Sequence, residues 1–293
     1  MTAQFNRFCD VTVHDRALKR LDVDFSITRS LETTANTAEL LIYNLNEESR
    51  KHLSQQAIDR PNGIVCKVDA GHREDPFAAS ITAALAGIIP EESPQIFLGE
   101  LREVTSVREG ADWITRISAG DGDAIKNTRV SFSSGPGATI PTVIDKMTKG
   151  LKAGITDAAR ALLRGEFKEV GKVLTESITV DGFVGDEMPR VLRSAGLEMS
   201  VQNGQIQILS IGKALGDVAV KLTPNTGLVG SPEVGAKGVL ALRCLLTAKV
   251  FPGRKIKVES ASITGVYRCH TVTYSGQTAG NDWYCDIEAQ PIR

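Results

Sequence analysis

A tryptophan-containing hairpin motif occurs twice in this 293-residue chain, and the repeat constrains the fold more than any other feature. The later copy spans residues 263–289, where runs rich in Val, Thr and Tyr flank a turn of Ser, Gly and Asn residues. In its second run Trp283, Cys285, Ile287 and Ala289 fall on one face. This alternation is typical of a strand with one buried face, so the sequence predicts a β-hairpin here.

The earlier copy of the motif spans residues 97–119 and has a shorter turn. The match rests on equal spacing: Asp112, Trp113, Ile117 and Ala119 correspond to Asp282, Trp283, Ile287 and Ala289, and Gly99, Arg102 and Thr105 correspond to Gly265, Arg268 and Thr271. Two ordinary amphipathic hairpins could match by coincidence. An internal duplication explains the spacing better and predicts two β-domains of one type, one towards each end of the chain.

The sequence predicts a mainly β fold with an α+β middle, in four parts. Residues 1–125 form a first β-barrel domain with an apolar insertion at 72–95, and residues 214–293 form a second. Between them, residues 126–175 are expected to form a helical connector, because apolar residues recur at helical spacing over 140–151 and 158–174. Residues 176–213 read as a small β-α-β-β module with a hairpin turn at Asn203-Gly204.

Three local features refine this outline. Residues 47–58 are expected to form one helix with Asn46 as its N-cap. The Gly-rich stretch 226–237 is expected to be a connecting loop, since no phosphate-binding helix start follows it. The apolar insertion, Phe77 to Pro90, either packs on its own domain or presents a contact surface to a partner, and the sequence leaves both open.

Composition excludes several function classes. The net charge is −1, without the basic excess of a nucleic-acid binder and without a block of like charge. The first fifteen residues lack the apolar core of a signal peptide. The longest apolar stretch, Phe77 to Pro90, is too short to cross a bilayer. We therefore expect a protein that is made in the cytoplasm and does not insert into membranes.

The titratable residues do not form a recognisable catalytic or metal-binding motif. The five cysteines have no metal-knuckle or disulfide spacing and are expected to be buried apolar groups, and the four histidines are scattered. Asp121 and Asp123, in a Gly-Asp-Gly-Asp turn, either hold a cation or are ordinary solvated turn carboxylates. We predict no catalytic, cofactor-binding or metal-binding residues, hence a structural protein and not an enzyme.

Short motifs near both ends of the chain carry a family resemblance. The N-terminal motifs are Ile27-Thr28-Arg29, Asn36-Thr37-Ala38-Glu39 and Ile42-Tyr43-Asn44-Leu45. The C-terminal motifs are Thr226 to Gly230, Cys244 to Leu246, Pro252-Gly253, Gly265 to Arg268, Asp282 to Tyr284 and Ile287 to Ala289. Together they resemble the baseplate or tail hub proteins of contractile-tailed bacteriophages, the late-control family, and the hub part of type VI secretion spikes. The insertion Phe77 to Pro90 has no counterpart in this resemblance.

The resemblance implies a homotrimer in which each chain supplies two tail-tube-like barrels. Three chains would then form a pseudo-sixfold ring that joins the hexameric tail tube, or its initiator, to a central spike or tail lysozyme. Other baseplate proteins would surround the ring, and genomic DNA would cross its lumen without being read. The expected location is the virion tail baseplate.

Two alternatives remain at this stage. A tail-associated peptidoglycan-degrading enzyme would need a positioned carboxylate pair or a metal site, and the sequence shows neither. A tail-tube or tape-associated initiator would share the barrel but would normally carry a single copy. The sequence identifies neither the spike partner nor the residues that face the lumen, and it does not distinguish a phage from a tailocin or secretion-system origin.

Overall fold

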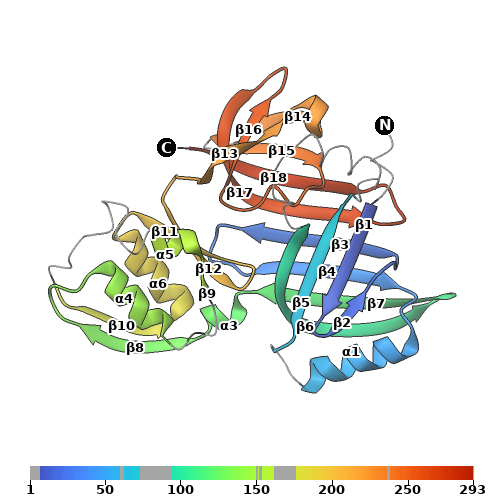
Figure 1. The fold of residues 1–293 in the computed structure, drawn as a ribbon, viewed down its shortest axis with the longest axis horizontal. Helices are drawn as coiled ribbons and strands as arrows, with labels where there is room; N and C mark the ends of the chain where they lie inside the picture. Colours follow the sequence, from blue (N-terminus) through green and yellow to red (C-terminus); the bar gives the residue numbers. More distant parts are fainter. Residues whose placement is uncertain are drawn as a thin grey trace, which may run out of the picture.

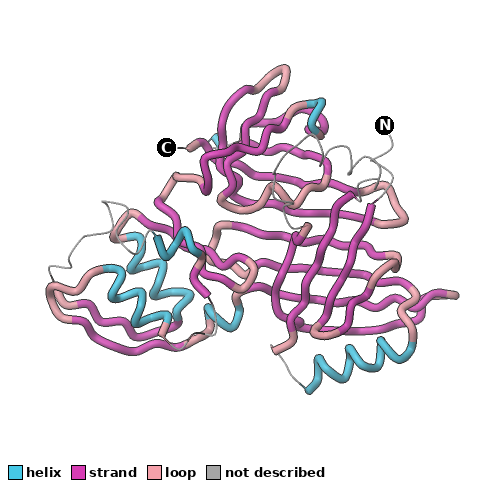
Figure 2. The backbone as a smooth tube through the Cα atoms, in the orientation of Figure 1, coloured by secondary structure: helices cyan, strands magenta, loops and turns pink. Residues whose placement is uncertain are grey.

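The fold is mainly β with a small α+β unit at one side, as the sequence predicts (Figures 1 and 2). This computed structural model describes residues 7–59, 63–72, 94–149, 151, 154–161, 176–235 and 238–292. The predicted insertion therefore lies almost wholly outside the described residues, as does most of the helix predicted for 158–174. No described helix has the length and apolar character needed to span a bilayer.

The N-terminal half contributes strands β1 to β7 and helix α1. Their bounds are β1 (Arg7–Val13), β2 (Arg16–Leu18), β3 (Val23–Ser30), β4 (Asn36–Tyr43), α1 (Glu47–Asp59), β5 (Val65–His72), β6 (Gln95–Glu109) and β7 (Asp112–Asp121). Burial alternates along β1, β3, β4 and β7, so one face of each strand enters the core.

The C-terminal half contributes six strands and a short 3₁₀ turn. Their bounds are β13 (Leu215–Leu222), η3 (Pro224–Thr226), β14 (Leu228–Val234), β15 (Leu240–Leu245), β16 (Arg254–Glu259), β17 (Thr264–Gln277) and β18 (Trp283–Pro291). The expectation of a connecting loop over 226–237 is wrong, because β14 pairs with β15 there. Gly230 and Pro232 lie in a bulge between Val229 and Glu233. Because glycine and proline are uncommon in strands, they interrupt the sequence pattern by which a strand is predicted.

The strands of both halves join in one 13-stranded sheet, and the two predicted barrels are not closed by pairing among the described strands. The main path runs β14-β15-β18-β17-β3-β4-β7-β6-β5-β1-β2, and β16 and β13 branch from β17. The edge of β3 is occupied by β17 of the other half instead of a strand of its own half. The two halves consequently share one apolar core.

The middle of the chain forms a separate α+β unit with its own core (Figure 1). Its elements are α3 (Asp123–Lys126), β8 (Arg129–Ser134), α4 (Ile140–Thr148), β9 (Gly154–Ile155), α5 (Asp157–Ala161), β10 (Ile178–Phe183), α6 (Val184–Arg193), β11 (Leu197–Gln202) and β12 (Gln205–Ser210). The β-α-β-β order of β10, α6, β11 and β12 is as predicted, and Asn203 and Gly204 both have positive φ in the turn.

Residues 126–175, predicted as a helical connector, contain helix α4 where the apolar spacing over 140–151 predicts one, together with strands β8 and β9. β8 pairs with β10 and β9 with β12, so these strands belong to the middle unit. β8 has only two alternating apolar residues, Val130 and Phe132, and β9 has only two residues in all, so both patterns are too short to predict a strand by themselves. The four domain boundaries themselves stay a prediction.

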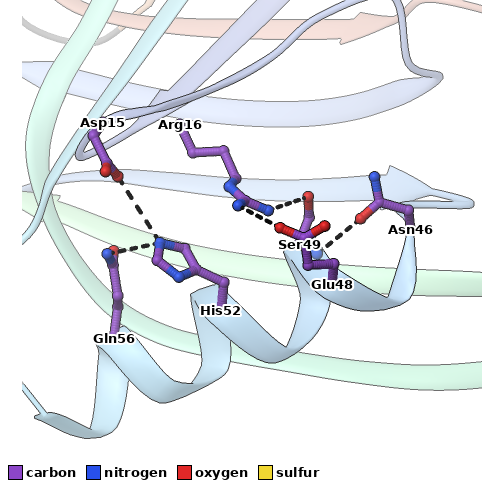
Figure 3. Close-up of polar contacts among 7 residues, drawn as sticks. All are labelled: Asp15, Arg16, Asn46, Glu48, Ser49, His52 and Gln56. Atoms are coloured by element: carbon purple, nitrogen blue, oxygen red, sulfur yellow. Dashed lines mark hydrogen bonds and ion pairs between the residues drawn. The ribbon is translucent and has the colours of Figure 1, made fainter.

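Helix α1 is fixed to the β1–β2 turn by a polar network (Figure 3). The Asn46 side chain accepts a hydrogen bond from the backbone N–H of Ser49 at 2.8 Å, which confirms it as the N-cap. Arg16 donates to Ser49 Oγ at 2.8 Å and to Glu48 Oε1 at 2.9 Å. On the next turns, the His52 ring lies 3.9 Å from Asp15 and 2.9 Å from Gln56 (Figure 3). These contacts orient α1 at the N-terminal sheet.

Candidate assembly interface

The two tryptophan-containing hairpins occupy equivalent places in the two halves. In order, the N-terminal strands are β3-β4-β7-β6-β5-β1 and the C-terminal strands are β14-β15-β18-β17-β16-β13. Each hairpin forms the third and fourth strands of its order, as β7 and β6 in the N-terminal half and as β18 and β17 in the C-terminal half. The final pairs differ, since β1 and β5 are antiparallel whereas β13 and β16 are parallel. The repeated order agrees with an internal duplication.

A bulge at the same place in both hairpins corrects the sequence alignment of their first strands. Ala119 pairs with Leu101 and Ala289 with Cys269, and one extra residue follows in each first strand. The extra residues are Arg102 and His270, so these two are the structural equivalents. The expected match of Arg102 with Arg268 is therefore wrong by two residues. Residues 110–111 lie between the last pair of the first hairpin, Glu109 with Asp112, whereas residues 278–281 lie between Gln277 and Asp282, which are hydrogen-bonded in the second. The two additional turn residues account for the offset.

The two tryptophans occupy equivalent register positions on the same face of their hairpins, but different residues pack over their rings. Trp113 pairs with Arg108 and Trp283 with Gly276, and each tryptophan lies six residues before the alanine that pairs next to the bulge. Trp283 is fully buried and meets the Phe25 ring edge-on, with centroids 5.4 Å apart. Trp113 is half-buried beneath the Arg50 guanidinium of α1, 3.9 Å from the ring centroid. The backbone positions of the two tryptophans are therefore equivalent, whereas the residues that contact their rings belong to different elements of the two halves.

The joint between the halves is an antiparallel strand pair, β17 with β3. Residues 271–277 of β17 pair with residues 24–30 of β3 in an unbroken register. Thr28 and Thr273 share a hydrogen bond of 3.1 Å across the joint. On the core side, the buried Tyr274 hydroxyl donates to the Val250 carbonyl at 2.6 Å. The joint thus has both ladder hydrogen bonds and a packed inner face.

Two strand edges beside these elements carry no strand partner among the described residues. One is the outer part of β6, residues 103–109, and the other is the outer edge of β14. Both edges expose valines, with Val107 42% exposed on β6 and Val229 36% and Val234 58% exposed on β14. Unpaired edges with apolar side chains are the usual templates for pairing with another chain.

A buried polar cluster fixes the middle unit to the N-terminal sheet. Asp121, 2% exposed at the end of β7, accepts hydrogen bonds from the backbone N–H of Asn203 at 2.7 Å and of Gly204 at 2.8 Å. The Asn36 side-chain amide donates to the same carboxylate at 3.2 Å. Burial raises the pKa of Asp121, and these hydrogen bonds oppose the rise. Arg29, also buried, donates to Gln202 at 3.0 Å.

A second polar contact fixes the middle unit to the C-terminal half. Arg268, 3% exposed on β17, pairs with Glu198 of β11 and donates to the Lys213 carbonyl at 3.2 Å. It also donates to Gln290 of β18 at 3.1 Å. Sequence reasoning missed this role and that of Arg29, because each depends on residues far away in the chain. The only available signal was the presence of arginine within apolar strand patterns.

The two turn carboxylates have different surroundings, and the cysteines are buried. Asp121 accepts the hydrogen bonds described above, and Asp123 pairs with Arg102 at 2.6 Å, so the alternative of an ordinary solvated turn carboxylate is wrong for Asp121. Among the described residues, no group of three or more His, Cys, Asp or Glu side chains could hold a metal ion. All five cysteines are free and buried, and burial raises the pKa of Cys66 to about 12.

A pocket of about 450 Å³ lies between the end of β5 and the turn of the closing hairpin. It is lined by Arg7, His72, Leu245, Thr278, Gly280, Asn281, Trp283 and Tyr284. Arg7 donates to the Gly280 carbonyl at 3.0 Å and lies 5.6 Å from the Trp283 ring centroid. These contacts tie the start of the chain to its closing hairpin, which no sequence motif indicated.

Solved phage tail proteins share this fold over nearly their whole length. A tail protein from Neisseria meningitidis MC58 matches with a TM-score of 0.65 and 10% identity, covering 98% of this chain and 97% of that one. The 43 kDa tail protein of prophage MuSo2 from Shewanella oneidensis matches with a TM-score of 0.63 and 13% identity, covering 97% and 98%.

A type VI secretion component has the same fold. This Escherichia coli protein, described as structurally similar to the T4 bacteriophage tail proteins gp27 and gp5, matches with a TM-score of 0.58 and 11% identity, covering 97% of this chain and 77% of that one. No family model and no curated protein matches the sequence. The structural neighbours are thus phage tail and type VI secretion proteins, which is the class of structure that the tail-hub resemblance predicts.

Proposed function

We propose that this protein is a structural component of a phage tail or a related contractile injection particle. The observation that carries the proposal is the repeated strand order within one chain, in a fold shared along its length with phage tail proteins. A repeated sheet serves assembly, because a small number of subunits can then present a ring of higher pseudo-symmetry.

In its finer form, the proposal is a trimeric baseplate hub. Three chains, each with two like sheets, build a pseudo-sixfold ring that matches a hexameric tail tube on one side. The middle unit, which contacts both halves, faces the central spike or tail lysozyme and other baseplate proteins. Genomic DNA passes through the lumen without specific contacts, which accords with the near-neutral net charge of −1.

Location within a particle tests this proposal. A tagged copy of the chain, produced together with the tail genes of its source, is expected to band with intact tails on a density gradient and to be labelled by gold at one tail end. A chain that stays at the top of the gradient while untagged tails assemble normally would contradict a tail role. The untagged chain, detected by mass spectrometry of the same band, controls for interference by the tag.

A peptidoglycan-degrading activity is the competing proposal, and zymography separates the two. The isolated protein is expected to leave cell-wall gels intact. Clearing by purified protein, retained after a second chromatographic step, would contradict a purely structural role. No contact among the described residues favours this alternative.

A further inference from the structure

Two of the five cysteines face each other across a strand pair of the C-terminal half. Cys244 of β15 is the register partner of Cys285 of β18. Directly opposed residues of an antiparallel pair have Cα atoms about 4.5–5.5 Å apart, and a disulfide accepts about 4.4–6.8 Å. The two thiols also share a hydrogen bond. The sheet register therefore holds this pair within reach of a disulfide bond.

The other three cysteines have no thiol opposite them. Each lies opposite an apolar residue in its strand pair: Cys9 opposite Ala70, Cys66 opposite Val13, and Cys269 opposite Ala289. All five cysteines are free and buried, so they differ in their partners and not in their exposure. The strand pairs of the chain thus oppose two cysteines at a single place.

The shared fold does not require thiols at this place. In the N-terminal half the equivalent pair is Ile42 of β4 with Thr115 of β7, and both residues are buried. Thr115 and Cys285 each lie two residues after the tryptophan of their hairpin. Because an alkyl group and a hydroxyl fill the same position in one half, the thiol pair of the other half adds a chemistry that packing does not demand.

We propose that Cys244 and Cys285 form a disulfide bond when the protein meets an oxidising environment, so that this pair is a site of covalent modification. The bond links two strands that each have neighbours on both sides in the sheet, and it closes a loop that contains β16 and β17. The inference does not depend on the proposed tail role, because it rests on the sheet register.

Exchange with a small disulfide, such as oxidised glutathione, supplies the oxidation. The thiolate of one cysteine attacks a glutathione sulfur, which forms a mixed disulfide and releases one glutathione. The thiolate of the other cysteine then attacks the protein sulfur of the mixed disulfide and releases the second glutathione. The two thiol protons end on the two released glutathiones, and the two electrons reduce the disulfide bond that joined them.

Burial makes this reaction slow in the closed fold. Burial and the hydrogen bond with Cys244 raise the pKa of Cys285, so little of the reactive thiolate is present. The backbone N–H of Thr247 donates to Cys285 Sγ at 3.5 Å, and the thiol lies 3.8 Å from the Thr247 carbonyl. Thr247 belongs to the connection between β15 and β16, residues 246–253. Opening of this connection gives an oxidant access to the pair without breaking the strand ladder.

Peptide mapping of the oxidised native chain tests the proposal. The protein is incubated with oxidised glutathione, its free thiols are alkylated after denaturation, and it is digested with trypsin and a protease that cuts before aspartate. Residues 244–249 are expected to be linked to residues 282–285, with Cys9, Cys66 and Cys269 alkylated. Free thiols at Cys244 and Cys285 after prolonged oxidation would overturn the proposal, as would a preferred link to any other cysteine.

Stability of matched alanine variants gives a second readout. Oxidation is expected to raise the ratio of folded to unfolded chain in urea at least about tenfold, because the bond restricts the unfolded chain. Cys244→Ala should abolish this rise, whereas Cys66→Ala, at an equally buried cysteine opposite Val13, should retain it. An equal rise in both variants would contradict the assignment. If C244A does not fold, the peptide map of the native chain decides.

Discussion

At the residue scale, two carboxylates of one turn have unequal structural importance. Asp121 is buried and accepts hydrogen bonds from Asn36, Asn203 and Gly204, which joins the N-terminal sheet to the middle unit. Asp123, two residues on, forms a partly exposed ion pair with Arg102. Buried acceptors with several donors cost much more to remove than exposed ion pairs.

Removing the buried carboxylate should therefore destabilise the protein. We expect Asp121→Ala to lower the free energy of unfolding by about 2–3 kcal/mol, because buried donors lose their acceptor. Asp123→Ala is the matched control and should cost less than about 1 kcal/mol. Urea denaturation followed by circular dichroism measures both. Equal losses would show that the cluster does not fix the middle unit.

Lys126 should destabilise the fold in a pH-dependent way. Burial lowers its pKa to about 8 despite the nearby carboxylates of Asp121 and Asp123. Burying a charged lysine costs stability at any pH at which the side chain is protonated in both the folded and the unfolded state. That cost falls as the pH rises from about 8, where the folded state loses the proton, towards the ordinary lysine pKa of 10.5, where the unfolded state also loses it. Lys126→Met should raise the thermal midpoint at pH 7, and the gain should shrink above about pH 8.

Thermal unfolding between pH 6.5 and 9.5 measures this effect in buffers of one ionic strength. Lys19→Met, at an exposed lysine, is the control for loss of a surface charge. A K126M advantage that stays constant across the range would contradict the assignment.

At the element scale, the closing hairpin depends on a close approach at Gly276. A Cβ atom added there would lie 2.3 Å from the Phe25 ring and 2.8 Å from the Trp283 ring. We expect Gly276→Ala to destabilise the protein by about 1–3 kcal/mol, because this buried corner cannot expand without moving both rings. Gly135, where an added Cβ atom would have open space around it, is the control, and Gly135→Ala should change stability by less than about 0.5 kcal/mol. Chemical denaturation of both variants distinguishes packing from a general effect of glycine replacement.

Several elements could be predicted from the sequence because their signals are local. The hairpins, helix α1 with its Asn46 cap, and the Asn203-Gly204 turn all follow from periodicity and turn chemistry. The bulges at Arg102 and His270 could not be predicted, since a bulge shifts the register by one residue without changing the alternation on either side. β14 was missed because Gly230 and Pro232 interrupt its pattern.

The contacts between parts of the chain could not be read from the sequence either. Arg29 meets Gln202, and Arg268 meets Glu198, across large sequence separations. The presence of two similar hairpins was readable, but not that β17 would pair with β3 and leave the β6 edge open. Pairing between distant edges depends on the whole sheet, and no short motif encodes it.

At the scale of the whole molecule, the chain is two related half-sheets joined edge to edge, with a middle unit that contacts both. With two like half-sheets in each chain, three copies present six similar positions, which is the arrangement that the proposed hub requires.

An electron cryomicroscopy reconstruction of the tail particle that contains this chain tests the central claim most directly. The account predicts three copies around the tail axis, with their half-sheets at six similar positions. A different number of copies, or half-sheets at dissimilar positions around the axis, would contradict it.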